Sequence, residues 1–107
     1  MWAEHGENLE RARDLIARAL KAEPDNPAYL DSMGWVLFKL NQPRDALGYL
    51  LKAVDESEEP DATIYDHLGD VYAALKETDK AREAWRKSLA VEANEQVQKK
   101  LDAARTD

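Results

Sequence analysis

The chain has 107 residues, of which 35% are charged and 44% hydrophobic, with a formal net charge of −7 and no cysteine. The lack of cysteine excludes disulfides, thiolate nucleophiles and cysteine-ligated metals. The negative charge argues against nucleic acid as a partner, because phosphate binding needs clustered lysine and arginine. No apolar run approaches the roughly 20 residues that cross a bilayer, so we expect a soluble domain with no membrane insertion. The composition indicates no compartment.

Apolar residues recur at helical spacing in the first part of the chain and predict two helices. We expect the first over residues 9–22, with Asn8 as its N-cap, because asparagine is a favoured capping residue. The second is expected over residues 27–40. Asn26 is its predicted cap, and Pro27 suits the first helical position, where a missing N–H costs nothing.

A short connector and a third helix follow. Asn41 is expected to take a left-handed conformation after the second helix. Pro43 then starts a helix over residues 43–56. Residues 57–61 form the longest connector, and this connector contains one extra residue relative to a 34-residue period.

The second half of the chain is predicted to hold three more helices and no strand, since no segment alternates with period two. The expected helices and their caps are residues 62–76 after Asp61, residues 79–91 after Thr78, and residues 95–105 after Asn94. The sixth helix places Val97, Leu101 and Ala104 on one face, as a terminal cap should. Its polar residues lie mostly elsewhere, namely Gln96, Lys99, Lys100 and Arg105.

Two copies of one pattern stand out along the chain, with a partial third copy upstream. The complete copies are Leu30-x2-Met33-Gly34-x2-Leu37, Ala46-x3-Leu50, Ala53, and then Tyr65-x2-Leu68-Gly69-x2-Tyr72, Ala81-x3-Trp85, Ser88. The partial copy is Ala12-x3-Ile16, Ala19, Pro24. Equivalent residues of successive copies are 34 or 35 residues apart. A repeat of this length predicts a stack of helical hairpins.

Two glycines inside the predicted helices need a physical reason, since glycine costs about 1 kcal/mol relative to alanine there. We expect close helix approach, with Gly34 facing Ala46 and Gly69 facing Ala81. Gly48 has no such role and is expected on an exposed face.

The repeated residues resemble the tetratricopeptide repeat family, whose pattern is W-x2-L-G-x2-Y, then A-x3-F, then P. The resemblance covers about residues 7–94, and Asp31-Ser32-Met33-Gly34-Trp35 and Asp66-His67-Leu68-Gly69-Asp70 particularly resemble bacterial members. The closing proline of the pattern is Pro24 in the first copy. In the second copy Pro60 is displaced from the expected position, and in the third copy Ala93 stands where proline is expected. The resemblance implies an all-α, right-handed superhelical solenoid of antiparallel helix pairs.

The resemblance also divides the chain into units. Residues 1–26 are expected to be a partial first repeat, 27–60 the second, 61–94 the third, and 95–107 a capping helix and tail. These make about two and a half repeats in one domain. Only Trp2 to His5 remain of a first helix for the first repeat, so we expect a piece of a longer array.

In this family the first helix of each repeat lines a concave groove. The resemblance therefore implies a partner-binding groove formed by Ala28, Asp31, Trp35, Phe38, Lys39, Thr63, Asp66, Asp70, Ala73 and Ala74. The spacing of Asp31, Trp35 and Phe38 independently places these three on one helical stripe. Two alternatives stay open: the rings pack against the adjacent repeat, or the carboxylates form a solvated face.

The groove residues also indicate the chemistry of a partner. Some relatives hold an acidic C-terminal peptide in a clamp of basic side chains, but Asp31 and Asp66 stand where a cation would be needed. We therefore expect a basic or amphipathic segment instead. Asp66, His67 and Asp70 are not expected to bind metal, because His67 should point away from the other two.

We find no nucleophile context and no glycine-rich phosphate loop, so we predict neither catalysis nor a cofactor. The predicted function is a non-catalytic scaffold for protein–protein interaction. The alternative is a self-association or structural-spacer module. It rests on the helix at residues 9–22, whose exposed apolar face could pair with a second copy to form a homodimer.

Overall fold

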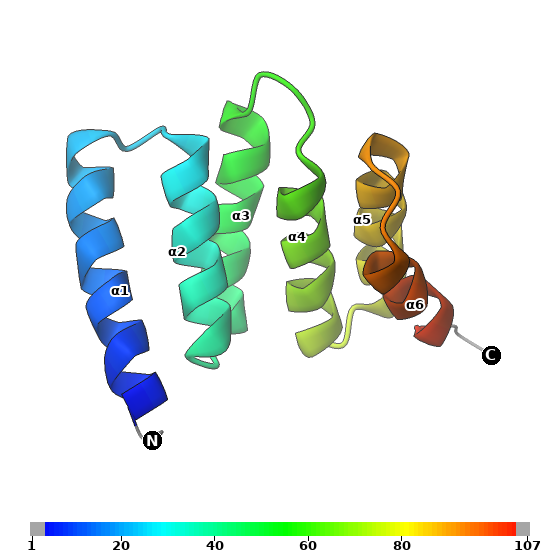
Figure 1. The fold of residues 1–107 in the computed structure, drawn as a ribbon, viewed down its shortest axis with the longest axis horizontal. Helices are drawn as coiled ribbons and strands as arrows, with labels where there is room; N and C mark the ends of the chain where they lie inside the picture. Colours follow the sequence, from blue (N-terminus) through cyan, green and yellow to red (C-terminus); the bar gives the residue numbers. More distant parts are fainter. Residues whose placement is uncertain (1–3, 105–107) are drawn as a thin grey trace.

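The computed structural model describes residues 4–104, with side chains from Asn8 onward. These residues form six helices in a row, with no strand among them (Figure 1). The helices are α1 (Glu4–Ala22), α2 (Pro27–Lys39), α3 (Pro43–Glu56), α4 (Ala62–Ala74), α5 (Thr78–Val91) and α6 (Glu95–Ala103).

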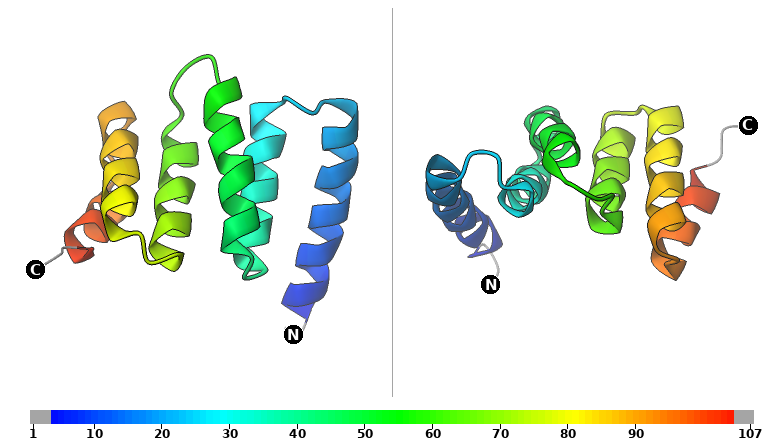
Figure 2. Two further views of the ribbon diagram at one scale, coloured as in Figure 1. Left: turned by 180° about the vertical axis from the view of Figure 1, so that it is seen from behind. Right: turned by 90° about the horizontal axis from the view of Figure 1, so that it is seen from above.

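The helices pair in the order of the chain. α2 packs against α3 and α4 against α5, while α1 packs against α2 and α6 against α5. α4 also contacts both α2 and α3, so it joins the two hairpins. α1 and α6 stand at opposite ends of the row (Figures 1 and 2). The expected all-α solenoid of antiparallel helix pairs is confirmed.

Three of the predicted N-caps are confirmed in their geometry. The Oδ1 atoms of Asn26, Asp61 and Asn94 each accept hydrogen bonds of 2.8 to 3.3 Å from two backbone N–H groups of the following turn. Pro27 and Pro43 are the first residues of α2 and α3, as expected. Each cap satisfies donors that a helix start leaves unpaired, and so sets where the first helix of a hairpin begins.

Two other predicted caps are wrong. Asn8 lies inside α1, which already begins at Glu4 and therefore needs no cap at residue 8. Thr78 is the first residue of α5, and Glu77 occupies the capping position without a side-chain hydrogen bond. The reason for the second error lies in the preceding turn, which brings the chain into α5 one residue earlier than the threonine suggested.

That turn is made by Lys76, which has a φ of 64°. Asn41 takes the same left-handed conformation, with a φ of 66°, in the equivalent turn 35 residues earlier. The prediction for Asn41 is confirmed, whereas the helix expected over residues 62–76 ends at Ala74. A left-handed lysine is less common than a left-handed asparagine, which is why its residue type gave no signal.

The core lies between the helices and consists of residues from the repeated pattern together with four others, Ile64, Val71, Ala84 and Val97. Its largest cluster contains Met33, Leu37, Ala46, Leu50, Leu68, Val71 and Ala84. A second cluster joins Leu30, Ala53 and Ile64, and a third joins Ala81, Trp85 and Val97. Leu101 and Ala104 pack against the third cluster, so the predicted apolar face of the sixth helix is confirmed, although that helix ends at Ala103.

The two helical glycines lie where a large side chain crosses the first helix of each hairpin. A Cβ on Gly34 would lie 2.6 Å from Cγ of Leu50 and 3.3 Å from the carbonyl oxygen of Ala46. A Cβ on Gly69 would overlap the indole ring of Trp85, including Cε2 at 2.6 Å. Close approach is thus supported at both glycines. At Gly34 the expected contact with Ala46 is present through its carbonyl oxygen, although Leu50 lies closer, whereas at Gly69 the nearest atoms belong to Trp85 and not to the expected Ala81.

We expect Gly69→Ala to destabilise the protein by about 1–3 kcal/mol, since a buried tryptophan ring must shift to admit the methyl group. Gly48→Ala is the matched control: Gly48 is exposed, and a Cβ there meets nothing within 4 Å. It should stabilise the fold by roughly 0.5–1 kcal/mol through helix propensity. Urea unfolding of both variants measures the difference, and equal midpoints would refute the close-approach explanation.

Candidate functional site

The ten residues predicted to form the groove lie on α2 and α4, and we call their surface the inner face. None of them is buried. Ala28, Lys39, Thr63, Ala73 and Ala74 are exposed, and Asp31, Trp35, Phe38, Asp66 and Asp70 are half-buried. The opposite side of the same helices carries the core residues Leu30, Met33, Ile64 and Leu68, so the helical period separates the core side from the inner face.

Trp35 is the centre of an aromatic group on the inner face. Its ring stacks on the imidazole of His67, with centroids 4.1 Å apart and an interplanar angle of 19°. Phe38 stacks on it as well, at 5.3 Å and 26°. The Lys39 ammonium lies 4.8 Å from the centroid of the indole. Three contacts therefore hold the tryptophan in place while it stays half-buried.

His67 links the two repeats through Asp31. The Nδ1 atom of His67 lies 2.8 Å from Oδ1 of Asp31, and both side chains are only 17% exposed. Because an ionised carboxylate only accepts, this hydrogen bond requires a proton on Nδ1. His67 was expected only to point away from Asp66 and Asp70, and a contact with α2 was not foreseen. The side chain belongs to α4 but lies against Asp31 and Trp35 of α2.

Lys100 makes the corresponding contact between α6 and α4. Its Nζ atom donates hydrogen bonds to Asp66, at 2.9 Å, and to Asp70, at 3.1 Å. Lys100 was expected away from the packed face of α6, and that expectation is wrong. The flexible lysine stem lets the ammonium reach the carboxylates of α4 beside the apolar contacts of Val97 and Leu101.

The two contacts occupy equivalent places when positions are counted from the N-caps. His67 is six residues after Asp61, and Lys100 is six residues after Asn94. Their acceptors Asp31 and Asp66 each lie five residues after the cap of the preceding first helix. We call this repeated interaction the inter-repeat contact.

The inter-repeat contact at α6 shifts the pKa of two of its members. Burial raises the pKa of the Asp70 carboxyl above its ordinary value, although the hydrogen bond from Lys100 pulls it down. For Lys100, burial alone would lower the pKa, but the hydrogen bonds to Asp66 and Asp70 outweigh it and raise the pKa. Both pKa values are therefore raised, for different reasons: burial dominates for Asp70, with a smaller contribution from the charge of Asp66, whereas two carboxylate acceptors dominate for Lys100.

These contacts decide between the alternatives for the inner face. Asp31, Asp66 and Asp70 are not a freely solvated surface, because each is half-buried and bonded to a side chain two helices further along the chain. Trp35 does pack against the adjacent repeat, through His67. It nevertheless keeps accessible surface, so packing between repeats and availability to a partner coexist.

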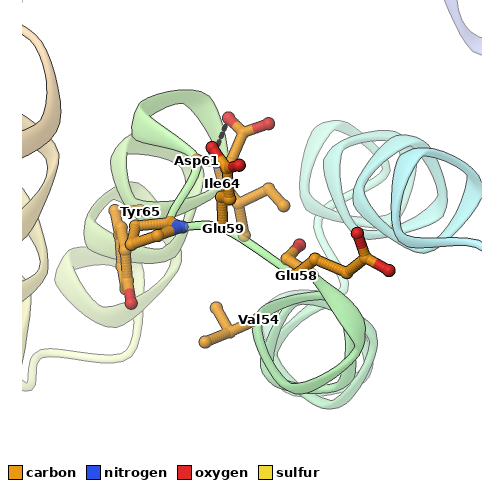
Figure 3. Close-up of a pocket in the computed structure, with 8 residues that line it drawn as sticks. Val54, Glu58, Glu59, Asp61, Ile64 and Tyr65 are labelled. Atoms are coloured by element: carbon orange, nitrogen blue, oxygen red, sulfur yellow. Dashed lines mark hydrogen bonds between the residues drawn. The ribbon is translucent and has the colours of Figure 1, made fainter.

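Two depressions lie away from the inner face. One of about 150 Å³ is lined by residues 54, 57–61, 64 and 65, where the longest connector passes between the hairpins. Figure 3 shows Val54 and Tyr65 facing this space from two sides, while the Glu58 carboxylate points away. The other, of about 280 Å³, lies between α3 and α5 and includes Leu51, Tyr65 and Tyr72.

We searched the described part of the chain for metal-binding clusters and membrane-spanning helices and found neither. Between residues 4 and 104, no three histidine, cysteine or acidic side chains gather closely enough to hold a metal ion. Nor does any helix described there combine the length and apolarity needed to span a bilayer.

Comparison with known proteins identifies the repeated unit. Residues 62–95 match the profile of the tetratricopeptide repeat. This segment runs from the first residue of α4 to the first residue of α6 and includes the hairpin around Gly69 and Trp85. Over these residues the chain carries a tetratricopeptide repeat.

Two curated relatives contain similar repeats. The TPR repeat-containing protein PA4667 of Pseudomonas aeruginosa is 44% identical over 59 residues, which is 55% of this chain and 10% of that protein. Human tetratricopeptide repeat protein 13 is 28% identical over 90 residues, or 84% of this chain and 10% of that protein. The chain thus spans about a tenth of the length of each curated relative.

Several solved structures share the fold, among them a tetratricopeptide repeat domain. The first such domain of Spaghetti (RPAP3), solved with the HSP90 peptide SRMEEVD, superposes with a TM-score of 0.86 at 20% identity, covering 92% of this chain and 78% of that one. MamA superposes with a TM-score of 0.84 at 23% identity, covering 95% and 60%. At these identities the likeness establishes the arrangement of helices.

Sequence reasoning missed His67 and Lys100 as residues of the inner face. The sequence did contain a signal for this placement. Both residues follow a predicted N-cap by six positions, and the helices that start at successive caps lie side by side. Counting from the caps rather than along a 34-residue period would have paired them with Asp31 and Asp66.

We expect Lys100→Met to raise the pKa of Asp70 further, since burial and the charge of Asp66 would then act without the ammonium. A carboxyl whose folded-state pKa is raised destabilises the fold as pH rises through that pKa. The loss of stability relative to wild type should therefore be larger at pH 7 than at pH 3. Carboxyl NMR titration and urea unfolding test this, with the exposed Lys99→Met as control. A loss independent of pH would contradict it.

Proposed function

We propose that this chain is a non-catalytic scaffold that presents its inner face to a peptide or helical segment of another protein. The tetratricopeptide fold commonly mediates protein–protein interaction. The observation that carries the proposal is the state of Trp35, which is held by His67, Phe38 and Lys39 yet remains half-buried. An aromatic side chain that is ordered before binding loses little entropy on binding, and such residues are frequent hot spots.

The charges of the inner face favour a basic or amphipathic segment. Among its ten residues, three are carboxylates and one, Lys39, is basic. Lys100, which reaches this surface from α6, is already bonded to Asp66 and Asp70. A clamp for an acidic peptide terminus needs cations with free donors, and this face supplies few.

The likeness to the Spaghetti domain bears on this choice. That domain was solved with the peptide SRMEEVD, which carries three carboxylate side chains and one arginine. The same arrangement of helices can therefore seat an acidic peptide in that protein. We propose a different preference here, because Asp31 and Asp66 lie on the surface that would receive the ligand.

A second candidate function is self-association or a spacer role within a larger repeat protein. It is favoured by α1, where Leu15 is 63% exposed. Trp2, which lies near the start of this helix in the sequence, is outside the described residues. In that case the apolar side of α1, rather than the inner face, would make the main contact.

Two helical peptides of equal length distinguish these proposals, one with lysine and one with glutamate at the same polar positions, together with SRMEEVD. By fluorescence anisotropy, we expect the lysine peptide to bind at least about tenfold more tightly than the glutamate peptide or SRMEEVD. This ratio corresponds to about 1.4 kcal/mol of binding free energy. Trp35→Ala should weaken it by roughly 30-fold, as for a hot spot of about 2 kcal/mol.

Val91→Ala, an exposed change on α5, is the control and should leave binding intact. Tighter binding of SRMEEVD than of the lysine peptide would overturn the preference for a basic segment. If no peptide responds to Trp35→Ala, the inner face is not the site. Sedimentation equilibrium then tests self-association.

A further inference from the structure

The depression of about 280 Å³ between α3 and α5 is a groove that we call the outer groove. α4 stands between these two helices in the row (Figures 1 and 2). It contributes Tyr65, Leu68 and Tyr72 to the groove, while Leu51 of α3 and Ala84 of α5 line it from the two sides. Leu51 is 43% exposed although its side chain is large and apolar. The groove therefore lies where the two complete hairpins meet.

Ala84 leaves space in the outer groove that its counterpart in the other hairpin fills. That counterpart is Tyr49 of α3, 35 residues earlier. Tyr49 is half-buried and packs against the core clusters that contain Leu30 and Met33. An aromatic ring thus completes the packing at this position of the first hairpin. In α5 the position carries only a methyl group, so the groove has room for an aromatic side chain from outside.

Two lysines of α5 lie at the rim of the outer groove. The Nζ atoms of Lys80 and Lys87 lie 5.8 Å from the ring centroids of Tyr72 and Tyr65, which keeps each ammonium beside the groove. The carboxylates with which they pair along the chain are 3.8 and 4.0 Å away, beyond hydrogen-bond distance. Both lysine side chains are more than half exposed. Their N–H donors can therefore bond to carboxylates of a partner.

The spacing of these groups along α5 specifies the order of groups on an occupant. Lys80 and Lys87 are seven residues apart, which is about 10.5 Å along a helix. Ala84 lies between them on the same stripe. A helix lying in the groove matches this stripe with two carboxylates seven residues apart and an aromatic side chain between them.

The longest connector sets the direction of such a helix. Residues 57–61 line the depression that adjoins the outer groove at Tyr65, and three of these five residues are acidic. Negative charge favours the N-terminal end of a helix, where the dipole is positive. An incoming helix therefore begins at the connector and runs antiparallel to α5. Its first carboxylate then opposes Lys87, its aromatic residue opposes Ala84, and its second carboxylate opposes Lys80.

We propose that the outer groove is a docking site for a helix of another protein that carries the pattern acidic-x2-aromatic-x3-acidic. The aromatic side chain enters the groove over Leu68 and Ala84, and Leu51 covers its edge. The two carboxylates bond to Lys80 and Lys87. The proposal does not rest on the inner face, whose proposed ligand is basic, so the chain can hold two different segments at once.

A second copy of the chain does not supply this pattern. None of the aromatic residues among the 107 has a carboxylate both three positions before it and four positions after it. The reversed spacing, four before and three after, is absent from the sequence as well. The net charge of −7 also opposes close pairing of two copies. These features favour a different protein as the occupant.

The test uses three peptides of about 17 residues, each with a lactam link on the face away from the groove, because unlinked helices of this length are marginal in water. The first carries Glu-x2-Trp-x3-Glu, the second has glutamine in place of both glutamates, and the third has alanine in place of tryptophan. With the first peptide, we expect saturable NMR shifts at Leu51, Tyr65 and Ala84 of the labelled protein.

Fluorescence anisotropy then measures the contribution of each group. The glutamine peptide should bind about fivefold more weakly than the first, as for two partly exposed ion pairs. The alanine peptide should bind at least about 30-fold more weakly, because it lacks the anchor that fills the groove.

Matched variants of the protein complete the experiment. Lys80→Glu combined with Lys87→Glu should weaken the first peptide at least about fivefold and leave the glutamine peptide unchanged. Lys21→Glu combined with Lys99→Glu makes the same change of charge at two exposed positions outside the groove and should leave both peptides unchanged. Trp35→Ala should also leave binding intact, which separates this site from the inner face. Circular dichroism checks that each variant keeps its helices.

Four results would overturn the proposal. They are equal binding of the glutamate and glutamine peptides, an equal loss in the two double-lysine variants, no binding of any peptide, and shifts confined to the inner face. So would a dimer in sedimentation equilibrium that Leu51→Glu dissociates, since a second copy would then occupy the groove.

Discussion

The contact between a helical glycine and a large side chain of the following helix is the constraint on which this structure depends. Gly34 under Leu50 and Gly69 under Trp85 bring each pair of helices too close for any other residue. The small residues Ala46, Ala53, Ala81 and Ser88 are buried around these crossings. Because glycine lowers the stability of an isolated helix, each hairpin is stable through packing rather than propensity. That packing fixes which side of α2 and α4 remains for other contacts.

A second, polar interaction couples one hairpin to the next. His67 bonds to Asp31, and Lys100 bonds to Asp66 and Asp70, in the same relative positions. The aspartates are therefore both part of the candidate binding surface and part of the junction between repeats. Any ligand that draws on these carboxylates acts on the junction as well. The proposed recognition surface and the stacking contact share the same residues here, which ties the shape of the inner face to the state of its ion pairs.

Most of the fold followed from local physical rules, whereas the contacts between repeats did not. The helix number, three N-caps and the core positions are set by hydrophobic period and capping chemistry, which act within a few residues. Asn8 and Thr78 show the limit of such rules, since a capping residue type is also common inside a helix or at its first position. The roles of His67 and Lys100 depend on the angle at which adjacent hairpins stack. The sequence of one segment alone does not determine this angle.

The N-caps Asn26, Asp61 and Asn94 are spaced by 35 and then 33 residues, yet the inter-repeat contact recurs at the same distance from each cap. In this array, the position of each contact residue is therefore fixed relative to the cap of its own helix and not relative to the preceding repeat. Additions or losses in the connectors before a cap change the length of the chain without displacing any residue of the inner face. Connector length thus differs between the repeats of this chain while the residues of the inter-repeat contact keep their alignment, so sequence comparisons anchored on caps should detect repeats that a fixed period misses.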